Sequence, residues 1–175
     1  MIRSLAAGAA ALLLAACATL APPEAPVPQL TAVPQSFEMN GRIAVRVGQR
    51  SDIAVLRWTR RGASDTWIVS SPLGNEMARI DSTPQGATLT GGGNEEQHAP
   101  SFEALTRKVL GVPIDPQWLA DGLVGKTPAN LPPGWQFAVD ESKDAGVVRL
   151  AKRITVRNGD TIVRLVVDGF RALAD

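Results

Sequence analysis

One residue of the chain combines a reactive side chain with a setting that suggests covalent modification, the single cysteine Cys17. It follows an apolar run from Leu5 to Ala16, which is preceded by the lone charge of Arg3. Such a run is too short to span a bilayer and is typical of a secretory signal. An ordinary signal peptide with a chance cysteine is the alternative. Because the cysteine is unique and lies at this junction, we favour acylation of its thiol.

The residues Leu14-Ala15-Ala16-Cys17 resemble the lipobox of bacterial lipoproteins. In those proteins the thiol takes a diacylglyceryl group, the signal is cleaved before the cysteine, and the new amine is acylated. Two or more acyl chains anchor a protein stably where one does not. The resemblance implies a signal peptide over residues 1–16 and a lipid anchor at Cys17. Ala18 stands where an aspartate would retain such a protein in the inner membrane, so it is compatible with the outer membrane.

The other residues that could do chemistry lack the neighbours that an active site needs. The only histidine, His98, follows Gly91-Gly92-Gly93 in a polar stretch, and without further ligands it cannot build the usual zinc site. The glycines are followed by neither a Lys-Ser/Thr pair nor a helix start, unlike a phosphate loop. Asp115, Asp121 and Glu141 lack the pairing expected of a glycosidase. We therefore expect no enzyme, no metal and no cofactor, and we interpret His98 as an exposed loop residue.

Length and charge indicate one neutral domain behind this leader. The chain has 175 residues and a net charge of +1, and loss of Arg3 with the signal brings the charge to zero. A neutral chain without a basic block argues against nucleic acid as a partner. Prolines crowd residues 18–35 and predict an extended tether. We expect a signal over 1–16, the lipidated cysteine and tether over 17–35, and one monomeric domain over 36–175.

From residue 36 onward, apolar and polar residues alternate, which predicts half-buried strands. Phe37, Ile43 and Val45 share one face of the first strand, opposite Glu38 and Arg42. Turn signals recur about every ten residues, which suggests an antiparallel meander. About five strands are predicted before the middle of the chain and about four after it, near residues 37–47, 54–59, 67–69, 78–80, 87–89, 135–139, 148–150, 154–156 and 161–170.

Two short helices are predicted between these groups of strands. Ser101 can cap the first, which Gly111 ends. Asp115 and Pro116 start the second, which we expect Gly122 and Gly125 to end. A consecutive antiparallel sheet of this size curls, so we predict a mainly β fold with a small α insertion. The expected architecture is an unclosed antiparallel β-barrel, or half-barrel, with a helical lid over an apolar cavity.

Two features of this pattern leave alternatives open. The tryptophans, among them Trp58 and Trp67, either pack in a core or line a cavity for a lipophilic ligand. Leu73, in the turn Ser71-Pro72-Leu73-Gly74, either folds back on the sheet or protrudes into solvent. If a cavity forms, we expect its lining to come from the early strands and the first helix, from Val45, Leu56, Trp58, Trp67, Val69, Phe102 and Leu105.

Several short motifs in order resemble the LolB family of outer-membrane lipoprotein receptors. After the lipobox these are Gly41-Arg42-Ile43-Ala44-Val45, Trp58, Ser71-Pro72-Leu73-Gly74, Gly111-Val112-Pro113-Ile114 and Ile162–Phe170. The resemblance runs from Cys17 to about Phe170, and it is carried by the ordered set, since no single motif is specific. The chain departs from the family pattern at Trp118 and Gly122 in the second helix, and at Phe170, where a tryptophan is frequent.

The resemblance implies a half-barrel whose cavity holds acyl chains. Members of the family take acylated lipoproteins from the periplasmic carrier LolA and insert them into the outer membrane, and a leucine that matches Leu73 contacts the membrane. The implied protein is lipid-anchored in the outer membrane and faces the periplasm. Its implied partners are a LolA-like carrier, acylated lipoprotein cargo and outer-membrane phospholipid. The alternatives are a carrier of a small lipophile and an accessory structural lipoprotein of an outer-membrane complex.

Overall fold

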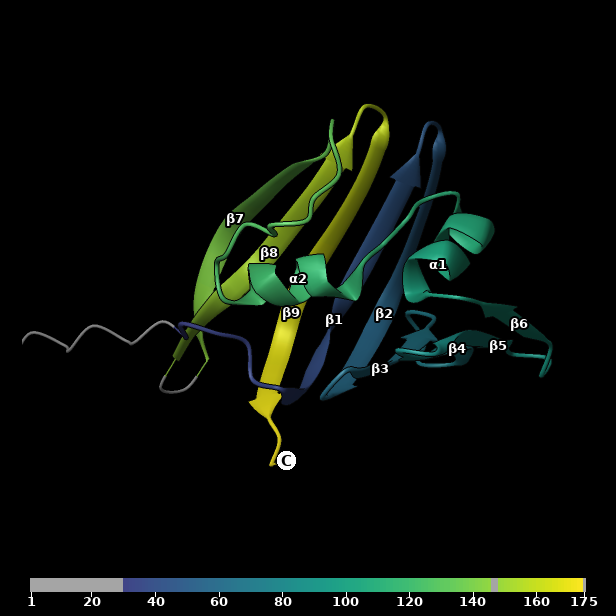
Figure 1. The fold of residues 1–175 in the computed structure, drawn as a ribbon, viewed down its shortest axis with the longest axis horizontal. Coiled ribbons are helices and arrows are strands. Elements are labelled where there is room, and N and C mark those ends of the chain that lie inside the picture. The colour runs from purple at the N-terminus through teal and green to yellow at the C-terminus, as the bar shows by residue number, and fades with distance from the viewer. Residues whose placement is uncertain (1–29, 146–147, 175) are drawn as a thin grey trace, which may run out of the picture.

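The computed structural model describes residues 30–145 and 148–174, so the predicted signal, Cys17 and most of the tether lie outside the described residues. It shows one antiparallel sheet in the order β6-β5-β4-β3-β2-β1-β9-β8-β7, with two short helices (Figure 1). The strands are β1 (Ser36–Val47), β2 (Arg50–Arg61), β3 (Ser64–Ser70), β4 (Glu76–Thr83), β5 (Gly86–Gly91), β6 (Glu96–Ala99), β7 (Gln136–Ala145), β8 (Val148–Asn158) and β9 (Thr161–Ala172). The sheet does not close, because β6 and β7 are its two edges.

Alternation along the strands gives the sheet one apolar face. In β1 the side chains of Phe37, Met39, Ile43 and Val45 are buried, while Arg42 between them is exposed. The period of two places these apolar residues on the inner, concave face. The mainly β, unclosed architecture predicted from this pattern is confirmed.

Gly41 in the middle of β1 is required by a close approach of two backbones. A Cβ at this position would overlap the carbonyl oxygen of Val166 on β9. The pairing of β1 with β9 also shifts register between Asn40 and Gly41, as expected for a β-bulge. A glycine here lets the central strands bend, which contributes to the curl of the sheet.

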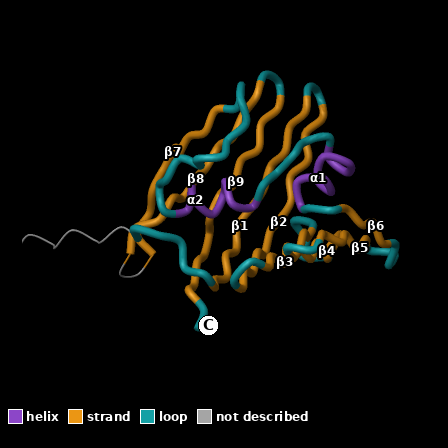
Figure 2. Tube along the Cα trace, viewed as in Figure 1, coloured by secondary structure: helices purple, strands orange, loops and turns teal. Residues whose placement is uncertain are grey.

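Helices α1 (Phe102–Leu110) and α2 (Pro116–Leu123) both lie across the inner face of the sheet (Figures 1 and 2). Ser101 caps α1 by accepting a hydrogen bond from the Ala104 amide at 3.1 Å, and Gly111 ends the helix with a φ of 77°. Asp115 caps α2 through the Gln117 amide at 2.8 Å. α1 packs over β5 and β6 and α2 over β8, so each helix covers a different half of the sheet. Neither is long and apolar enough to cross a membrane, and no other helix is present in the described residues.

Of the two glycines predicted to end α2, Gly122 was wrongly assigned, because it lies within the helix. A Cβ at Gly122 would come within 2.7 Å of Phe137 Cζ and 2.9 Å of Ile154 Cδ1. The glycine therefore allows α2 to approach β7 and β8 closely, at a cost of about 1 kcal/mol in helix propensity. The helix gives way to a turn at Gly125, which has a φ of 76°.

The strand count around the helices also differs from the expectation of five and then four. Within residues 30–145 and 148–174, six strands precede the helices and three follow them. The predicted runs near 148–150 and 154–156 are one strand, β8. The extra early strand is β6, which carries His98, so this residue is exposed but does not lie in a loop. Its polar sequence gives no apolar alternation, and it forms because the turn after β5 returns it to pair with that strand.

Candidate functional site

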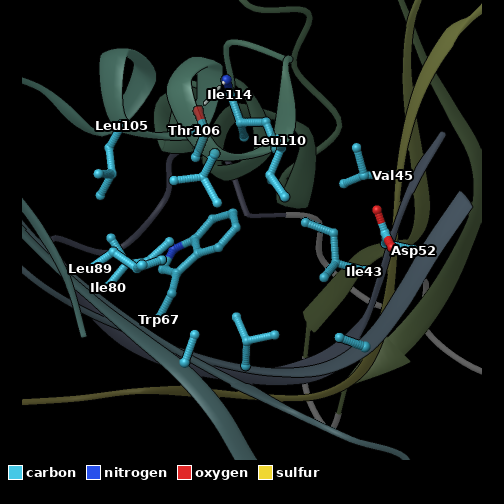
Figure 3. A pocket seen from close by; sticks show the side chains of 14 residues that line it. Ile43, Val45, Asp52, Trp67, Ile80, Leu89, Leu105, Thr106, Leu110 and Ile114 are labelled. Carbon is cyan, nitrogen blue, oxygen red and sulfur yellow. Dashed lines mark hydrogen bonds between the residues drawn. The ribbon is translucent and has the colours of Figure 1, made fainter. Parts of the chain in front are cut away.

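A cavity of about 160 Å³ lies between the inner face of β1–β5 and helix α1. Its walls are almost entirely apolar, since Asp52 and Thr106 are the only polar residues among those that line it. Figure 3 shows Trp67 on one wall with Ile80 and Leu89 beside it, and the residues of α1 opposite. A partly open apolar space of this kind favours a lipophilic occupant.

The strands supply the walls by their alternation. Trp67 and Val69 on β3 pair with Ile80 and Ala78 on β4, so all four point to the inner face. The indole Nε1 of Trp67 is buried and has no hydrogen-bond partner within the described residues. This N–H is the one polar side-chain group among these four residues, and the rest of the wall is hydrocarbon.

The structure separates the seven residues predicted to line the cavity into two groups. Val45, Trp67, Val69 and Leu105 line it. The other three, Leu56, Trp58 and Phe102, are buried in the adjoining core and are not among the lining residues. Two of the core residues support the cavity wall, because the rings of Trp58 and Phe102 pack against Trp67 at centroid distances of 5.4 and 4.7 Å.

Sequence reasoning missed several lining residues, among them Ala54, Ala78, Ile80, Leu89, Val109, Leu110 and Ile114. Part of the signal was available, since Ala78, Ile80 and Leu89 occupy apolar positions of predicted strands. Leu110 and Ile114 could not be assigned in this way, because their direction depends on how α1 sits on the sheet.

Thr106 holds the chain after α1 in place at the cavity. Its hydroxyl accepts a hydrogen bond from the buried Ile114 amide at 2.9 Å and donates to the Glu103 carbonyl at 3.2 Å. Thr106 is itself buried, so the hydroxyl satisfies a backbone donor that would otherwise be unpaired. This contact links α1 to the segment that leads to α2.

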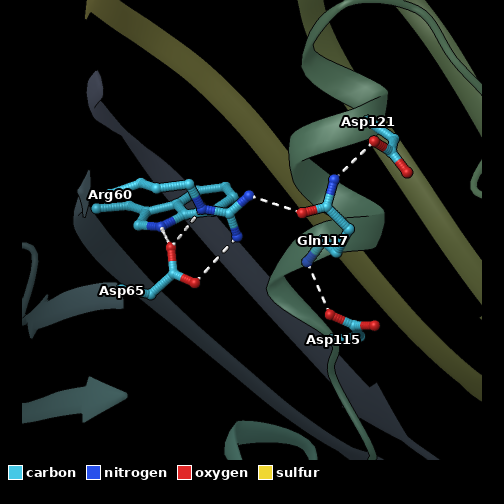
Figure 4. Close-up of polar contacts among 6 residues, drawn as sticks. Arg60, Asp65, Asp115, Gln117 and Asp121 are labelled. Atoms are coloured by element: carbon cyan, nitrogen blue, oxygen red, sulfur yellow. Dashed lines mark hydrogen bonds and ion pairs between the residues drawn. The ribbon is translucent and has the colours of Figure 1, made fainter. Parts of the chain in front are cut away.

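A buried polar cluster holds α2 to the C-terminal end of β2 (Figure 4). Arg60 Nε and Nη2 donate to the two oxygens of Asp65 at 2.8 and 3.0 Å, and Asp65 also accepts from Trp58 Nε1 at 2.6 Å. Arg60 Nη1 then donates to Gln117 Oε1 on α2 at 2.9 Å. The guanidinium packs near the rings of Phe37 and Trp58. The guanidinium of Arg60 thus has hydrogen-bond partners on β3 and on α2, and these contacts hold α2 against the sheet.

The other half of the concave face is filled by α2 and its neighbours. Trp118 packs against Trp135 with ring centroids 5.8 Å apart, and Leu119 is buried. The space lined by Trp118, Leu119, Trp135 and Val163 has no room for a water molecule. The apolar cavity described above therefore lies in the half of the sheet under α1.

Leu73 is 90% exposed at the tip of the β3–β4 turn. The turn is closed by hydrogen bonds from the Ser71 amide to the Asn75 carbonyl at 2.8 Å and from the Gly74 amide to the Ser71 carbonyl at 2.9 Å. Gly74 has a φ of 90°, which favours glycine. Of the two alternatives left open by the sequence, the structure has the leucine protruding.

Residues considered for catalysis or metal binding are not brought together. The described residues contain no group of three or more His, Cys, Asp or Glu that could hold a metal ion. Asp115 accepts a hydrogen bond from the backbone amide of Gln117 on α2, and Asp121 accepts one from the side-chain amide of the same residue. Glu141 forms ion pairs with Lys152 and Arg153.

The fold and the cavity place the chain in the class of open antiparallel half-barrels that have an apolar cavity beneath one helix, a site chemically suited to a lipophilic ligand. The family model described as "Outer membrane lipoprotein LolB" matches residues 35–169. The chain belongs to the LolB family of outer-membrane lipoproteins, whose members are receptors and not enzymes.

Individual relatives agree with this assignment. A protein named "Outer-membrane lipoprotein LolB" from Azoarcus sp. (strain BH72) is 30% identical over 92% of this chain and 91% of its own length. Proteins of the same name from Alkalilimnicola ehrlichii and Neisseria meningitidis are each 29% identical, over 94% and 89% of this chain and 94% and 84% of their own lengths. The predicted family and the predicted outer-membrane location are confirmed.

Proposed function

We propose that the cavity under α1 holds the acyl chains of a lipoprotein received from a LolA-type carrier, and that the protein then inserts this cargo into the outer membrane. Membership of the LolB family supports the receptor role. The observation that carries the proposal is the apolar cavity, with Asp52 and Thr106 as its only polar lining residues. Such a wall can bind hydrocarbon and offers little to a polar substrate.

Transfer between two apolar cavities needs no chemical energy source. An acyl chain leaves one apolar surface and enters another, so the area removed from water changes little. The direction then depends on which protein binds the chain more tightly, as in any coupled equilibrium.

Loading requires the cavity to widen. Its volume of about 160 Å³ is below the roughly 300 Å³ at which sites for small ligands begin. We propose that α1 moves outward while α2, bound by Arg60 through Gln117, stays in place. Hydrogen exchange during loading tests this step, because the amides of α1 should exchange faster while those of α2 do not change. Equal changes in both helices would contradict it.

The anchor and the turn complete the proposal. Cys17, outside the described residues, is acylated and holds the protein at the membrane, which mass spectrometry of the N-terminal peptide tests. An unmodified thiol there would contradict this. Leu73 at its exposed turn contacts the bilayer during delivery.

The test of the function is a transfer experiment. Full-length purified protein is mixed with a LolA-type carrier loaded with an acylated lipoprotein, and the location of the cargo is followed by affinity separation. We expect cargo to move to this protein and then to added vesicles. Retention of all cargo on the carrier would contradict the proposal. Co-purification with a fixed multi-subunit complex would instead favour the accessory role.

A further inference from the structure

The large hydrophobic side chains that are exposed in the described part of the chain are found in one region, around the β3–β4 turn. Their exposed fractions are 90% for Leu73, 66% for Ile53, 54% for Met77 and 38% for Val55. Single exposed apolar residues are ordinary on protein surfaces, but several in one place mark a contact surface.

Strand pairing brings these four residues together. Val55 pairs with Ser70, the last residue of β3, so the turn with Leu73 continues beside the part of β2 that precedes Val55, where Ile53 lies. Met77 is the second residue of β4, at the bulge in its pairing with β3. The exposed apolar surface therefore spans β2, the turn and the start of β4.

This surface is distinct from the cavity. Asp52 and Ala54 line the cavity, so the alternating residues Ile53 and Val55 lie on the opposite, outer face of β2. The sheet thus has an apolar cavity on its inner face and an apolar contact surface on its outer face at the same end of β2.

Cationic side chains border this surface on the outer face. Arg57 follows Val55 by two residues, and Arg46 lies two residues beyond Ala44, the β1 partner of Ile53. Both are exposed, and neither has an ion pair with another of the described residues. An apolar centre with free guanidinium groups at its edge fits the interface of a bilayer that contains anionic phospholipid.

We propose that Leu73, Ile53 and Met77 insert together into a bilayer surface while Arg46 and Arg57 bind anionic phospholipid headgroups. This inference rests on the proposed function and adds to it the extent and lipid chemistry of the membrane contact. The unpaired guanidinium groups of Arg46 and Arg57 at the edge of the apolar surface favour a bilayer with negative headgroups over a neutral bilayer.

The lone native cysteine makes a site-specific probe possible. Acylation consumes the thiol of Cys17, so each of the variants Leu73→Cys, Ile53→Cys and Met77→Cys carries one reactive thiol for a nitrobenzoxadiazole fluorophore. Gln85→Cys is the control, because Gln85 is exposed in the turn at the other end of β4. The unsubstituted protein must take no label.

The labelled full-length proteins are reconstituted into vesicles of phosphatidylethanolamine with phosphatidylglycerol, or of phosphatidylcholine alone. We expect blue-shifted emission and quenching by nitroxide-labelled lipid for the probes at positions 53, 73 and 77 in the anionic vesicles. The shift should be smaller in phosphatidylcholine, and the probe at position 85 should stay in water. If the probe at 73 inserts while those at 53 and 77 stay in water, only the turn tip contacts lipid and the inference is wrong.

A second measurement tests the headgroup contact. Arg57→Gln and Arg46→Gln should each lower the docked-to-undocked ratio in anionic vesicles about fivefold, and added salt should remove most of this difference. Arg61→Gln is the matched control, because Arg61 lies on the same strand and face but farther from the surface. Unchanged docking in both arginine variants would overturn the anionic preference.

Failure of this inference and failure of the proposed function give different results. Cargo acceptance from the carrier is measured on the same variants and should be normal in all of them. Normal docking without acceptance would contradict the proposed function alone. Shielding of the probes by the carrier protein, with no response to vesicles, would assign the surface to a protein interface and overturn the inference.

Discussion

Arg60 and Asp65 form the one ion pair within the described residues in which both side chains are buried. The two charged groups contact each other directly. Asp65 also accepts a hydrogen bond from the indole of Trp58, and Arg60 also donates one to the side-chain amide of Gln117. Pairing offsets the cost of removing both charges from water, but either charge alone would lose that compensation. The loss of one charged residue should therefore lower the free energy of unfolding much more at a buried pair than at an exposed one.

Arg60→Ala is expected to destabilise the protein by about 3–5 kcal/mol, because it leaves Asp65 buried without its partner. Arg42→Ala is the control, since the Arg42–Asp168 pair at 3.2 Å is about half exposed and should contribute at most about 1 kcal/mol. Urea unfolding of both variants measures the difference. Similar unfolding midpoints would contradict the buried pair.

Leu73→Glu should leave the free energy of unfolding almost unchanged, because a side chain already in water loses no buried area. The variant should still accept cargo from the carrier, yet deliver it slowly to vesicles, since a charge opposes insertion into the acyl region. Leu73→Met, which keeps an apolar side chain, should deliver normally. Delivery by Leu73→Glu at the normal rate would disprove the membrane contact.

Two glycines lie where elements distant in the sequence come close, Gly41 against the backbone of β9 and Gly122 against side chains of β7 and β8. Neither role follows from local conformational preference, since each depends on an element far away in the sequence. At this scale the packing of elements decides which residue is tolerated.

Gly41→Ala should destabilise the protein by about 3 kcal/mol, at the upper end of overpacking costs, because the new methyl group meets backbone that cannot move away. Gly92→Ala is the control, since its Cβ would come no closer than 3.6 Å to a neighbouring atom. That change should stay within about 0.5 kcal/mol. Thermal unfolding of both proteins provides the comparison, and equal melting temperatures would contradict the close approach.

Ala54→Phe should fill the cavity from β2 without unfolding the protein. We expect acceptance of acylated cargo to fall at least about tenfold, which corresponds to roughly two CH₂ groups of the bound chain kept in water. Ala44→Phe, on the outer face of β1, should accept cargo normally. Affinity separation after mixing with loaded carrier measures both, and full acceptance by Ala54→Phe would place the acyl chains elsewhere.

The fold was accessible from the sequence because alternation and turn signals are local. Strands such as β1 and both helix caps, Ser101 and Asp115, were predicted correctly. β6 was missed, because its residues carry no apolar alternation and depend on pairing with β5. For the cavity, the sequence identified the apolar face but could not separate Trp58 from Trp67, since that division depends on where α1 rests.

At the scale of the whole molecule, the sheet is divided into two halves with different properties. Over β8, α2 packs tightly and is fixed by Arg60 through Gln117. Under α1, the half formed by β1–β5 keeps an open apolar space. The chain belongs to a family of outer-membrane lipoprotein receptors, and under the proposed function the fixed half is the frame and the half under α1 holds the cargo.

The most direct test of the central claim, that the cavity binds the cargo's acyl chains, is photo-crosslinking from its wall. A benzophenone amino acid replaces Trp67, which lines the cavity, or Thr66, its neighbour on the opposite face of β3. Each full-length protein is mixed with carrier that holds a lipoprotein with labelled acyl chains and is then irradiated. The account predicts crosslinks to the acyl chains from position 67 and none from position 66. Cargo accepted without any crosslink at 67, or equal crosslinks at both positions, would contradict it.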